Sequence, residues 1–221
     1  MAQLKGLSRF FLSTAALLVL AACQPEKQEA PAAPAAEKTA VFESSSTVKQ
    51  TLNGTDVSKD DIGGDFTLTD GNGQPFSLSS LNGKAVILSF GYTHCPDVCP
   101  TELLTYSDVL KHLGDEAKNV AVVFVSVDPE RDTPELIGKY VKQFHPDFIG
   151  LTATEGQSLP IVKQQYRVVS AKTNEQSEKV YLVDHSAGAY LLDKAGNPAV
   201  FSPYGSTAEQ IAQDLKVLLQ R

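Results

Sequence analysis

Residues 90–100 read FGYTHCPDVCP, and this segment places two cysteines, Cys95 and Cys99, between an apolar run and an amphipathic run. The run before it, residues 85–90, is almost continuously apolar, as expected of a buried central strand. The run after it, residues 100–113, has apolar residues near helical spacing. Binding sites of α/β domains collect where a strand leads through a loop into a helix. The two cysteines therefore lie where an α/β fold would place a functional site.

Further elements on both sides of this segment alternate between strands and helices. The pattern predicts strands at residues 66–68, 76–78, 120–127, 148–151, 179–183, 190–192 and 199–201, and helices at residues 133–144, 159–166 and 207–219. A turn signal, DGNG at residues 70–73, separates the first two strands, and Thr133-Pro134-Glu135 is a typical helix start. The order predicts one α/β domain, residues 61–221, with a mixed sheet flanked by helices.

Residues 1–22 resemble an export signal. Two positive charges, at Lys5 and Arg9, precede an apolar run of eleven residues, which is too short to span a bilayer. The run ends in LAAC at residues 20–23, which resembles the lipobox of bacterial lipoproteins. This resemblance implies cleavage after residue 22 and acylation of Cys23, and several acyl chains on one residue give stable membrane anchoring. The alternative is an ordinary signal peptide followed by a chance cysteine.

Residues 23–60 are predicted to form a flexible, lipidated tether. The segment at residues 24–40 is rich in Pro, Ala, Glu and Lys and has no apolar periodicity, so it cannot bury enough surface to fold. Removal of the signal would change the formal net charge from −7 to −9 (−7 minus 2). An acidic chain without a long basic run is not expected to bind nucleic acid.

The sequence around the two cysteines predicts reactive thiols. An exported protein lies where disulfides persist, so two cysteines four positions apart are a candidate redox or metal-binding pair. Pro100 suits the first position of the helix, which would put Cys99 at the N-cap. The positive end of the helix would then lower the pKa of the thiols. Residues four apart share a helical face, so the pair can close a disulfide or bind one soft ion.

The available donors favour copper over zinc at such a pair. Thiolates favour both Cu(I) and zinc, but a structural zinc site normally needs four protein ligands. Among the four histidines, His94 is predicted to pack at the strand end, whereas His112 and His145 are predicted at the surface. His185 ends a predicted strand and would face the cysteine loop in a thioredoxin-type sheet. From its spacing alone, however, a structural role for this histidine is the more frequent one.

Three motifs in order resemble the Sco/SenC family of copper proteins. They are the Cys-x-x-x-Cys-Pro loop after Gly-Tyr-Thr-His, the segment VDPERDTP at residues 127–134, and VDHS at residues 183–186 followed by YLLD at residues 190–193. The resemblance covers residues 61–219 and implies a thioredoxin-like fold with an additional β-hairpin. It also implies that Cys95, Cys99 and His185 bind a copper ion, as Cu(I) or alternatively as Cu(II).

The same resemblance implies a function and a location. Sco proteins are named for the assembly of cytochrome c oxidase, so the expected role is delivery of copper to its binuclear site, or reduction of that site's cysteines. The partner would be the copper-bearing subunit of the oxidase, or another copper or thiol protein of the envelope. The domain would lie in the periplasm or on the outer face of the cytoplasmic membrane, anchored by Cys23. The segment Asp128–Thr133 reads as a turn with a helix cap.

Three other functions would use the same cysteines. A thiol–disulfide oxidoreductase would use Cys95 and Cys99 without metal, although their spacing departs from the Cys-x-x-Cys of thioredoxin. A peroxiredoxin would typically have a threonine three residues before its reactive cysteine, where this chain has Tyr92. A structural lipoprotein would gain little stability from a disulfide that closes so short a loop. Replacement of His185 would distinguish the oxidoreductase from the copper protein. Copper binding needs that imidazole, whereas thiol exchange does not.

Overall fold

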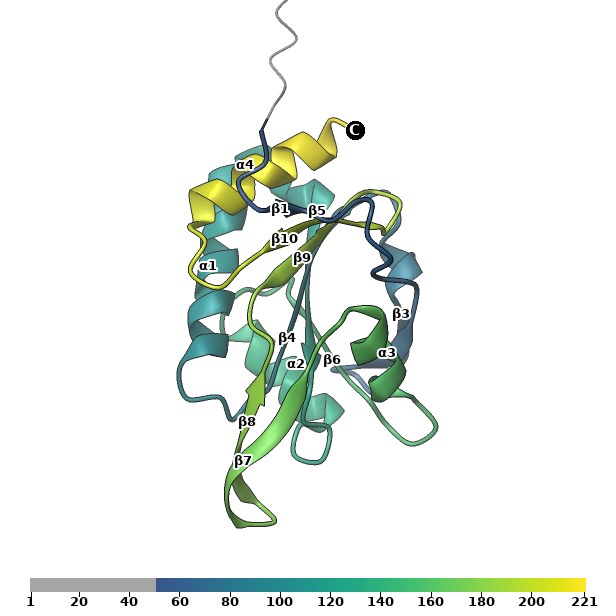
Figure 1. Cartoon of the computed structure of the whole chain (residues 1–221), viewed down its shortest axis with the longest axis vertical. Coiled ribbons are helices and arrows are strands. Elements are labelled where there is room, and N and C mark those ends of the chain that lie inside the picture. Colours follow the sequence, from purple (N-terminus) through teal and green to yellow (C-terminus); the bar gives the residue numbers. More distant parts are fainter. Residues whose placement is uncertain (1–50) are drawn as a thin grey trace, which may run out of the picture. The chain divides into compact units, whose positions relative to one another are not determined.

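The two most apolar segments of the domain form adjacent parallel strands, β4 (Ala85–Gly91) and β5 (Val120–Ser126). Every residue of both strands is buried, which explains why neither alternates with polar residues. A third strand, β6 (Ile149–Thr152), continues the parallel arrangement beside β5. The computed structural model that shows this arrangement describes residues 51–221 (Figure 1).

The predictions for the first part of the chain lie outside the described residues. They comprise the signal peptide at residues 1–22, the acylated Cys23 and most of the tether. None of the helices in residues 51–221 combines the length and the apolar character that crossing a membrane requires.

In residues 51–221 the central strands belong to an eight-stranded mixed sheet with the order β1-β10-β9-β4-β5-β6-β2-β3. The outer strands are β1 (Thr55–Asp56), β2 (Thr67–Asp70), β3 (Pro75–Ser77), β9 (Ala189–Leu192) and β10 (Pro198–Ser202). They join the parallel centre by antiparallel pairing, β9 with β4 and β2 with β6. A separate antiparallel hairpin consists of β7 (Ser170–Ser177) and β8 (Val180–His185). The mixed sheet and the additional hairpin confirm the predicted fold class.

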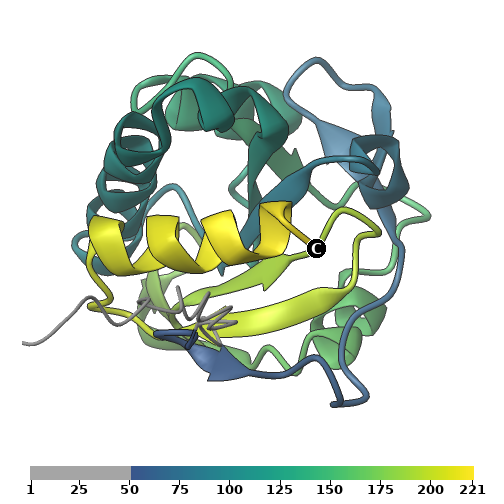
Figure 2. The same cartoon turned by 90° about the horizontal axis from the view of Figure 1, so that it is seen from above.

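Helices cover both faces of the sheet (Figure 2). One face carries α1 (Val98–Leu113), α2 (Pro134–Lys142) and α4 (Ala208–Leu219), and the other carries α3 (Leu159–Gln165). The structure also has two short 3-10 helices, η1 (Leu78–Leu81) and η2 (Gly114–Asn119). The crossovers β4-α1-β5 and β5-α2-β6 run in one direction, and their common hand puts α1 and α2 on the same face. The predicted start of α2 is confirmed, because the Thr133 side chain accepts a hydrogen bond from the backbone N–H of Leu136. A capping box of Thr207 and Gln210 starts α4.

Two strands lie where the sequence predicts none. Thr55 in β1 pairs with Phe201 in β10, although residues 23–60 read as a tether, so the folded unit begins before residue 61. β7 consists, apart from Ala171, of polar residues, is mostly exposed and has no apolar alternation, but its backbone pairs with β8 over most of its length. Apolar periodicity cannot reveal a strand of two residues or a strand with almost no apolar residues.

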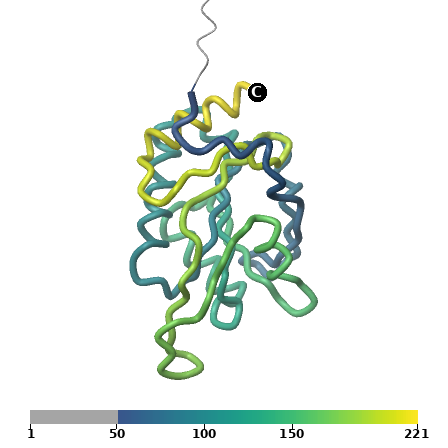
Figure 3. The backbone as a smooth tube through the Cα atoms, viewed as in Figure 1, coloured from purple at the N-terminus to yellow at the C-terminus, as the bar shows by residue number. Residues whose placement is uncertain are grey.

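The β7–β8 hairpin projects from the end of the domain that lies opposite α4 and the C-terminus (Figures 1 and 3). From β8 the chain passes through residues 186–188 into β9, where Ala189 pairs with Ser89 of β4. β4 in turn leads into the cysteine segment. The base of the hairpin and the cysteine loop therefore meet at the same end of the sheet, beyond the last residue of β4.

Candidate metal centre

The cysteine loop connects β4 to α1, and its helix begins earlier than predicted. The sequence predicts Cys99 at the N-cap and Pro100 as the first helical residue. In the structure Asp97 is the N-cap and α1 begins at Val98, so both predicted residues lie within the first helical turn. Pro100 is tolerated there because the N–H groups of the first turn have no intrahelical acceptor. The helix starts with a backbone hydrogen bond of 3.3 Å from Thr101 N to Asp97 O.

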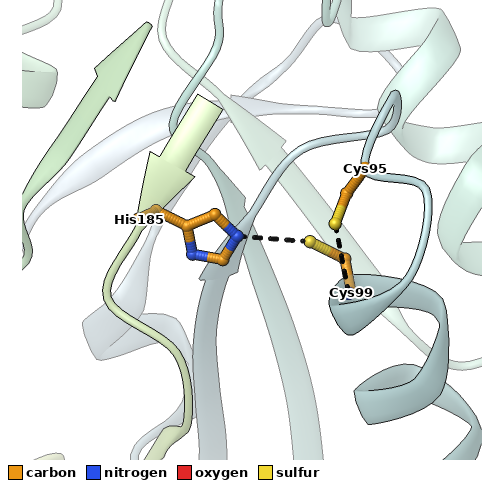
Figure 4. Close-up of side chains that lie close together, drawn as sticks. All are labelled: Cys95, Cys99 and His185. Atoms are coloured by element: carbon orange, nitrogen blue, oxygen red, sulfur yellow. Dashed lines mark hydrogen bonds between the residues drawn. The ribbon is translucent and has the colours of Figure 1, made fainter. Parts of the chain in front are cut away.

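Cys95, Cys99 and His185 come together, with one ligand atom of each within 4.8 Å of the others (Figure 4). Nε2 of His185 lies 3.4 Å from Sγ of Cys99, and the backbone N–H of Cys99 donates to Sγ of Cys95 at 3.4 Å. Both thiols are unbridged; Cys99 is buried, whereas Cys95 and His185 are half-buried. The structure thus groups the three residues that the family resemblance implies as copper ligands.

The ring of His185 is oriented by a backbone carbonyl. Its Nδ1 atom lies 2.8 Å from the carbonyl oxygen of Ser186, which can only accept a hydrogen bond. Nδ1 therefore carries the proton, and in the neutral ring Nε2 presents its lone pair toward the thiols (Figure 4). The ring also packs edge-to-face against Tyr92, with the ring centres 5.9 Å apart. Histidines that bind metals are commonly oriented through the nitrogen that does not bind the ion.

A glycine allows the Cys99 thiol to pack closely against the sheet. Gly91 is the last residue of β4. A Cβ atom at this position would lie 2.8 Å from Sγ of Cys99 and 2.7 Å from the ring of Phe124. Glycine in a strand marks such places, where another group approaches the backbone closely. The position of the buried thiol therefore requires glycine at residue 91.

The two thiols differ in their affinity for a proton. A hydrogen bond from the Cys99 thiol, aided by the His185 imidazole, lowers the pKa of Cys95 well below its ordinary value, although burial opposes this effect. The hydrogen bond to Cys95 and burial both raise the pKa of Cys99. Burial acts to lower the pKa of His185, but hydrogen bonding to Cys95 and to the Ser186 carbonyl raises it overall. The reduced pair therefore holds a thiolate at Cys95 and a thiol at Cys99 near neutral pH.

A buried carboxylate on the cysteine helix holds the loop that follows His185. Oε1 of Glu102 accepts a hydrogen bond from the backbone N–H of Gly188 at 2.9 Å. Its second oxygen, Oε2, has no hydrogen-bond partner within the part of the chain that the structure describes. Burial raises the pKa of Glu102 to about 7. The sequence carries no signal for this role, because a glutamate in a helix is usually solvent-exposed.

The other three histidines lie outside the cluster. His94, which the sequence predicts to pack at the strand end, is instead half-exposed. Its Nδ1 atom lies 3.0 Å from Oγ1 of Thr93 and 3.7 Å from Asp132. His112 is exposed in the last turn of α1, as predicted. His145, which the sequence predicts at the surface, is half-buried after α2.

The segment Asp128–Thr133 contains a helix cap, as predicted, and also a buried anchor for the cysteine loop. Thr133 caps α2. Asp132 is fully buried and accepts hydrogen bonds from the backbone N–H of Thr93 at 3.0 Å and from the Ser126 hydroxyl at 2.6 Å. Asp132 therefore fastens the cysteine loop to the end of β5. The sequence signal for this role is the pair of aspartates shortly after a buried strand.

Solved structures of similar sequence have the same architecture. Bradyrhizobium japonicum ScoI with copper bound is 42% identical, with a TM-score of 0.65 over 72% of this chain and 99% of that chain. Arabidopsis thaliana ScoI with copper bound is 38% identical, with a TM-score of 0.66 and the same two coverages, 72% and 99%. These similarities confirm the predicted thioredoxin-like fold.

Sequence relatives agree with the structural comparison. A SCO2-like protein of Rickettsia felis is 38% identical over 156 residues, which are 70% of this chain and 76% of the relative. The model of the SCO1/SenC family matches residues 54–220, a span that contains Cys95, Cys99 and His185. The chain therefore belongs to the SCO1/SenC family.

Proposed function

We propose that this chain binds Cu(I) through Cys95, Cys99 and His185 and supports assembly of the binuclear copper site of cytochrome c oxidase. One observation carries the proposal: two thiol sulfurs and one imidazole nitrogen converge within 4.8 Å. Membership of the SCO1/SenC family supports it, as do two similar proteins whose structures have copper bound.

The donor set suits Cu(I) as the cargo. Thiolates are soft ligands that favour Cu(I), and a structural zinc ion would normally require a fourth protein ligand. Within residues 51–221 the cluster consists of two cysteines and one histidine. Two thiolates and one imidazole can hold Cu(I) in a trigonal arrangement. Cu(II), which prefers a tetragonal arrangement, would need additional oxygen ligands.

The oxidation state of the cysteines would control loading. A disulfide between Cys95 and Cys99 would occupy both sulfurs and prevent Cu(I) binding. In the reduced protein Cys95 is already a thiolate, whereas Cys99 must lose its proton when the ion binds. Because Nδ1 of His185 keeps its proton on the Ser186 carbonyl, Nε2 is the nitrogen that would bind the ion.

Exposure of the ligands suggests the order in which a partner would replace them. Cys95 and His185 are half-buried, so the thiolates of an incoming partner can reach an ion from their side. Cys99 is buried against the sheet and would be the last ligand to release the ion. Such stepwise exchange would transfer copper without releasing it to solvent.

Thiol–disulfide exchange is the second candidate function. The asymmetry of the pair favours it, because an accessible thiolate at Cys95 precedes a buried thiol at Cys99. The accessible thiolate would attack a partner disulfide, and the second thiol would then resolve the mixed disulfide. The two functions are compatible, since reducing the cysteines of the oxidase would prepare that site for copper.

The anchor and location form part of the proposal. A lipid on Cys23 would tether the domain to a membrane of the envelope through the segment that ends before β1, with the domain in the periplasm. The test is mass spectrometry of the purified chain, which should begin at an acylated Cys23. A chain that retains residue 22, or that begins at an unmodified residue, would contradict this location.

The copper proposal is tested by anaerobic titration of the reduced protein with Cu(I) in the presence of a competing chelator. The wild type should bind one ion per chain, and His185→Ala should bind it at least about tenfold more weakly. His112→Ala, which removes an exposed histidine of α1, is the matched control and should bind as the wild type does. If the wild type does not bind Cu(I) but forms a reducible Cys95–Cys99 disulfide, thiol exchange becomes the leading function.

A further inference from the structure

The hairpin that carries His185 is attached to the domain by side chains. Within the described residues, β8 shares ladder hydrogen bonds with β7 and with no strand of the eight-stranded sheet. The Arg131 guanidinium donates to the carbonyl oxygen of Tyr181 at 2.8 Å, and the Tyr92 hydroxyl accepts from the backbone N–H of Val183 at 3.2 Å. Two side chains therefore stand where a neighbouring strand would otherwise bind the edge of β8.

The guanidinium group of Arg131 is confined by a carboxylate and two aromatic rings. Its Nε donates to Asp128 at 2.6 Å, and Asp128 also accepts from the Tyr181 hydroxyl at 2.7 Å. The central carbon of the guanidinium lies 3.5 Å from the centre of the Tyr181 ring and 5.7 Å from that of the Tyr92 ring. The side chains of Arg131 and Asp128 are 10% and 2% exposed, so water hardly competes for these contacts. The planar, forked donor group of arginine suits this site in a way that lysine would not.

Tyr92 connects this cluster to the metal centre. Its ring contacts Arg131 and also packs edge-to-face against His185, at 5.9 Å between the ring centres. Its hydroxyl holds Val183, which precedes His185 by two positions in the same strand. A shift of Arg131 would therefore reach the imidazole both through the Tyr92 ring and through the backbone of β8.

We propose that Arg131 is a positioning residue that holds His185 beside the two thiols by fastening β8 to the end of the sheet. Its role in copper binding rests on the proposed function. Without the Arg131 side chain the hairpin keeps its internal ladder and the hydrogen bond of Val183 to Tyr92, but it loses the hydrogen bond that holds the Tyr181 carbonyl. His185 then spends less time near Cys95 and Cys99, and an incoming ion finds two thiolates without the imidazole.

Lys172 provides a matched control on the same aromatic ring. Its ammonium group lies 4.5 Å from the centre of the Tyr181 ring and pairs with Glu130 at 2.6 Å. The pair links β7 to the segment that carries Arg131, but both of its charged groups are substantially exposed, so it contributes little to holding the hairpin. Lys172→Met therefore removes a cation from Tyr181 and loosens the hairpin only slightly.

The first test is a double-mutant cycle on the reduced full chain, read by anaerobic Cu(I) titration against a competing chelator. Arg131→Met should weaken Cu(I) binding about tenfold, and it should have no further effect in a chain that already carries His185→Ala. Lys172→Met should stay within about twofold of the wild type. An equal loss with and without His185 would overturn the proposal, because Arg131 would then act on the fold as a whole.

The second test uses the metal-free reduced protein and does not depend on copper. Hydrogen exchange followed by NMR should show amides of β8, including Val183, exchanging about tenfold faster in Arg131→Met, whereas amides of β4 and β5 keep their protection. Unchanged protection of β8 would overturn the proposal whether or not the wild type binds copper. Faster exchange in a chain whose wild type binds no Cu(I) would support the attachment and contradict only the proposed function.

A milder variant covers the case in which Arg131→Met does not fold, since that change leaves the Asp128 carboxylate buried without its cation. Arg131→Lys keeps a cation that can pair with Asp128 but lacks the planar fork that also donates to the Tyr181 carbonyl. It should speed the exchange of β8 about threefold and weaken Cu(I) binding in the same direction. Wild-type values for both measurements in this variant would overturn the proposal.

Discussion

Nε2 of His185 lies 3.4 Å from Sγ of Cys99, although the two residues are 86 positions apart in the chain. Cys99 comes from the first turn of α1 and His185 from the last position of β8. The two elements meet because β9, which follows the hairpin, pairs with β4. The three-ligand group therefore exists only when the sheet has formed, and the unfolded chain retains just the local cysteine pair.

Cu(I) should consequently stabilise the reduced folded protein. At a free concentration a thousandfold above the dissociation constant, binding to the folded state alone would add about 4 kcal/mol to the free energy of unfolding. The gain will be smaller to the extent that the unfolded cysteine pair also binds the ion. Thermal unfolding followed by circular dichroism in a Cu(I) buffer measures this effect. After oxidation to the Cys95–Cys99 disulfide the effect should vanish, and a rise in Tm of the oxidised protein would place the ion elsewhere.

The asymmetry of the two thiols predicts selective alkylation. Cys95 should react with iodoacetamide much faster than Cys99, because its pKa is lowered and its side chain is accessible. Between pH 7 and pH 5 an ordinary thiol loses about 100-fold of its thiolate, whereas Cys95 should lose less than about threefold. Quenched labelling of the metal-free protein, followed by tandem mass spectrometry, locates the modified residue. Equal labelling of Cys95 and Cys99 would contradict the proton distribution of the pair.

Histidine variants provide a further test in the same alkylation experiment. The imidazole of His185 contributes to lowering the pKa of Cys95. His185→Ala should therefore make the labelling of Cys95 fall more steeply as the pH is lowered. His112→Ala should leave the pH profile unchanged, because His112 is exposed in the last turn of α1.

Most of the fold could be predicted from local patterns in the sequence. The apolar runs that became β4 and β5 are fully buried strands, and Thr133 starts α2 as its sequence indicates. Such features depend on neighbouring residues alone, which is why periodicity and capping rules detect them. β7 was missed because its polar side chains face solvent and its partner, β8, supplies the reason for its extended backbone.

The candidate metal centre likewise contains some residues that local sequence patterns reveal and others whose contacts come from distant parts of the chain. The spacing of Cys95 and Cys99 points to a shared ion or a disulfide, since both cysteines lie on one short segment. His185 could be assigned only through the resemblance to a family, because its distance from the thiols depends on the pairing of β9 with β4. Glu102 and Arg131 were not predicted at all, because their partners, Gly188 and Tyr181, come from a distant part of the chain.

A methyl group at residue 91 should displace the buried thiol. The Cβ atom of Gly91→Ala would lie 2.8 Å from Sγ of Cys99, so either the helix or the side chain must shift. We expect a loss of about 1–3 kcal/mol in the free energy of unfolding. We also expect Cu(I) binding that is about tenfold weaker. Chemical denaturation and the chelator titration measure the two effects.

Gly83→Ala separates close packing from general loss of stability. Gly83 has φ +96, and apart from its two chain neighbours no residue has an atom within 4 Å of the place that a methyl group would take, so alanine there is strained but does not clash with the packing around it. The substitution should lower the free energy of unfolding by about 1 kcal/mol and leave Cu(I) affinity unchanged. Wild-type copper affinity in Gly91→Ala would show that the site tolerates a displaced Cys99.

The buried carboxylate of Glu102 predicts how stability depends on pH. Its pKa is raised to about 7 in the folded protein, above the ordinary value of 4.5 that applies to the unfolded chain. Between these values the folded state binds more protons than the unfolded state. The free energy of unfolding contributed by this group therefore falls as the pH rises from 4.5 to about 7 and is constant above that range. The full decrease is about 3 kcal/mol.

Glu102→Gln removes this titration and keeps an oxygen that can accept the hydrogen bond from Gly188. The variant should therefore gain stability relative to the wild type as the pH rises from 4.5 to about 7. Chemical denaturation of the metal-free reduced proteins at several pH values measures the difference. Glu155→Gln, at an exposed position outside the helices and strands, is the control for loss of a surface carboxylate and should stay close to the wild type in stability. A constant difference between wild type and Glu102→Gln across the range would mean that the carboxylate of Glu102 ionises in the folded protein as it does in water, and that burial does not raise its pKa.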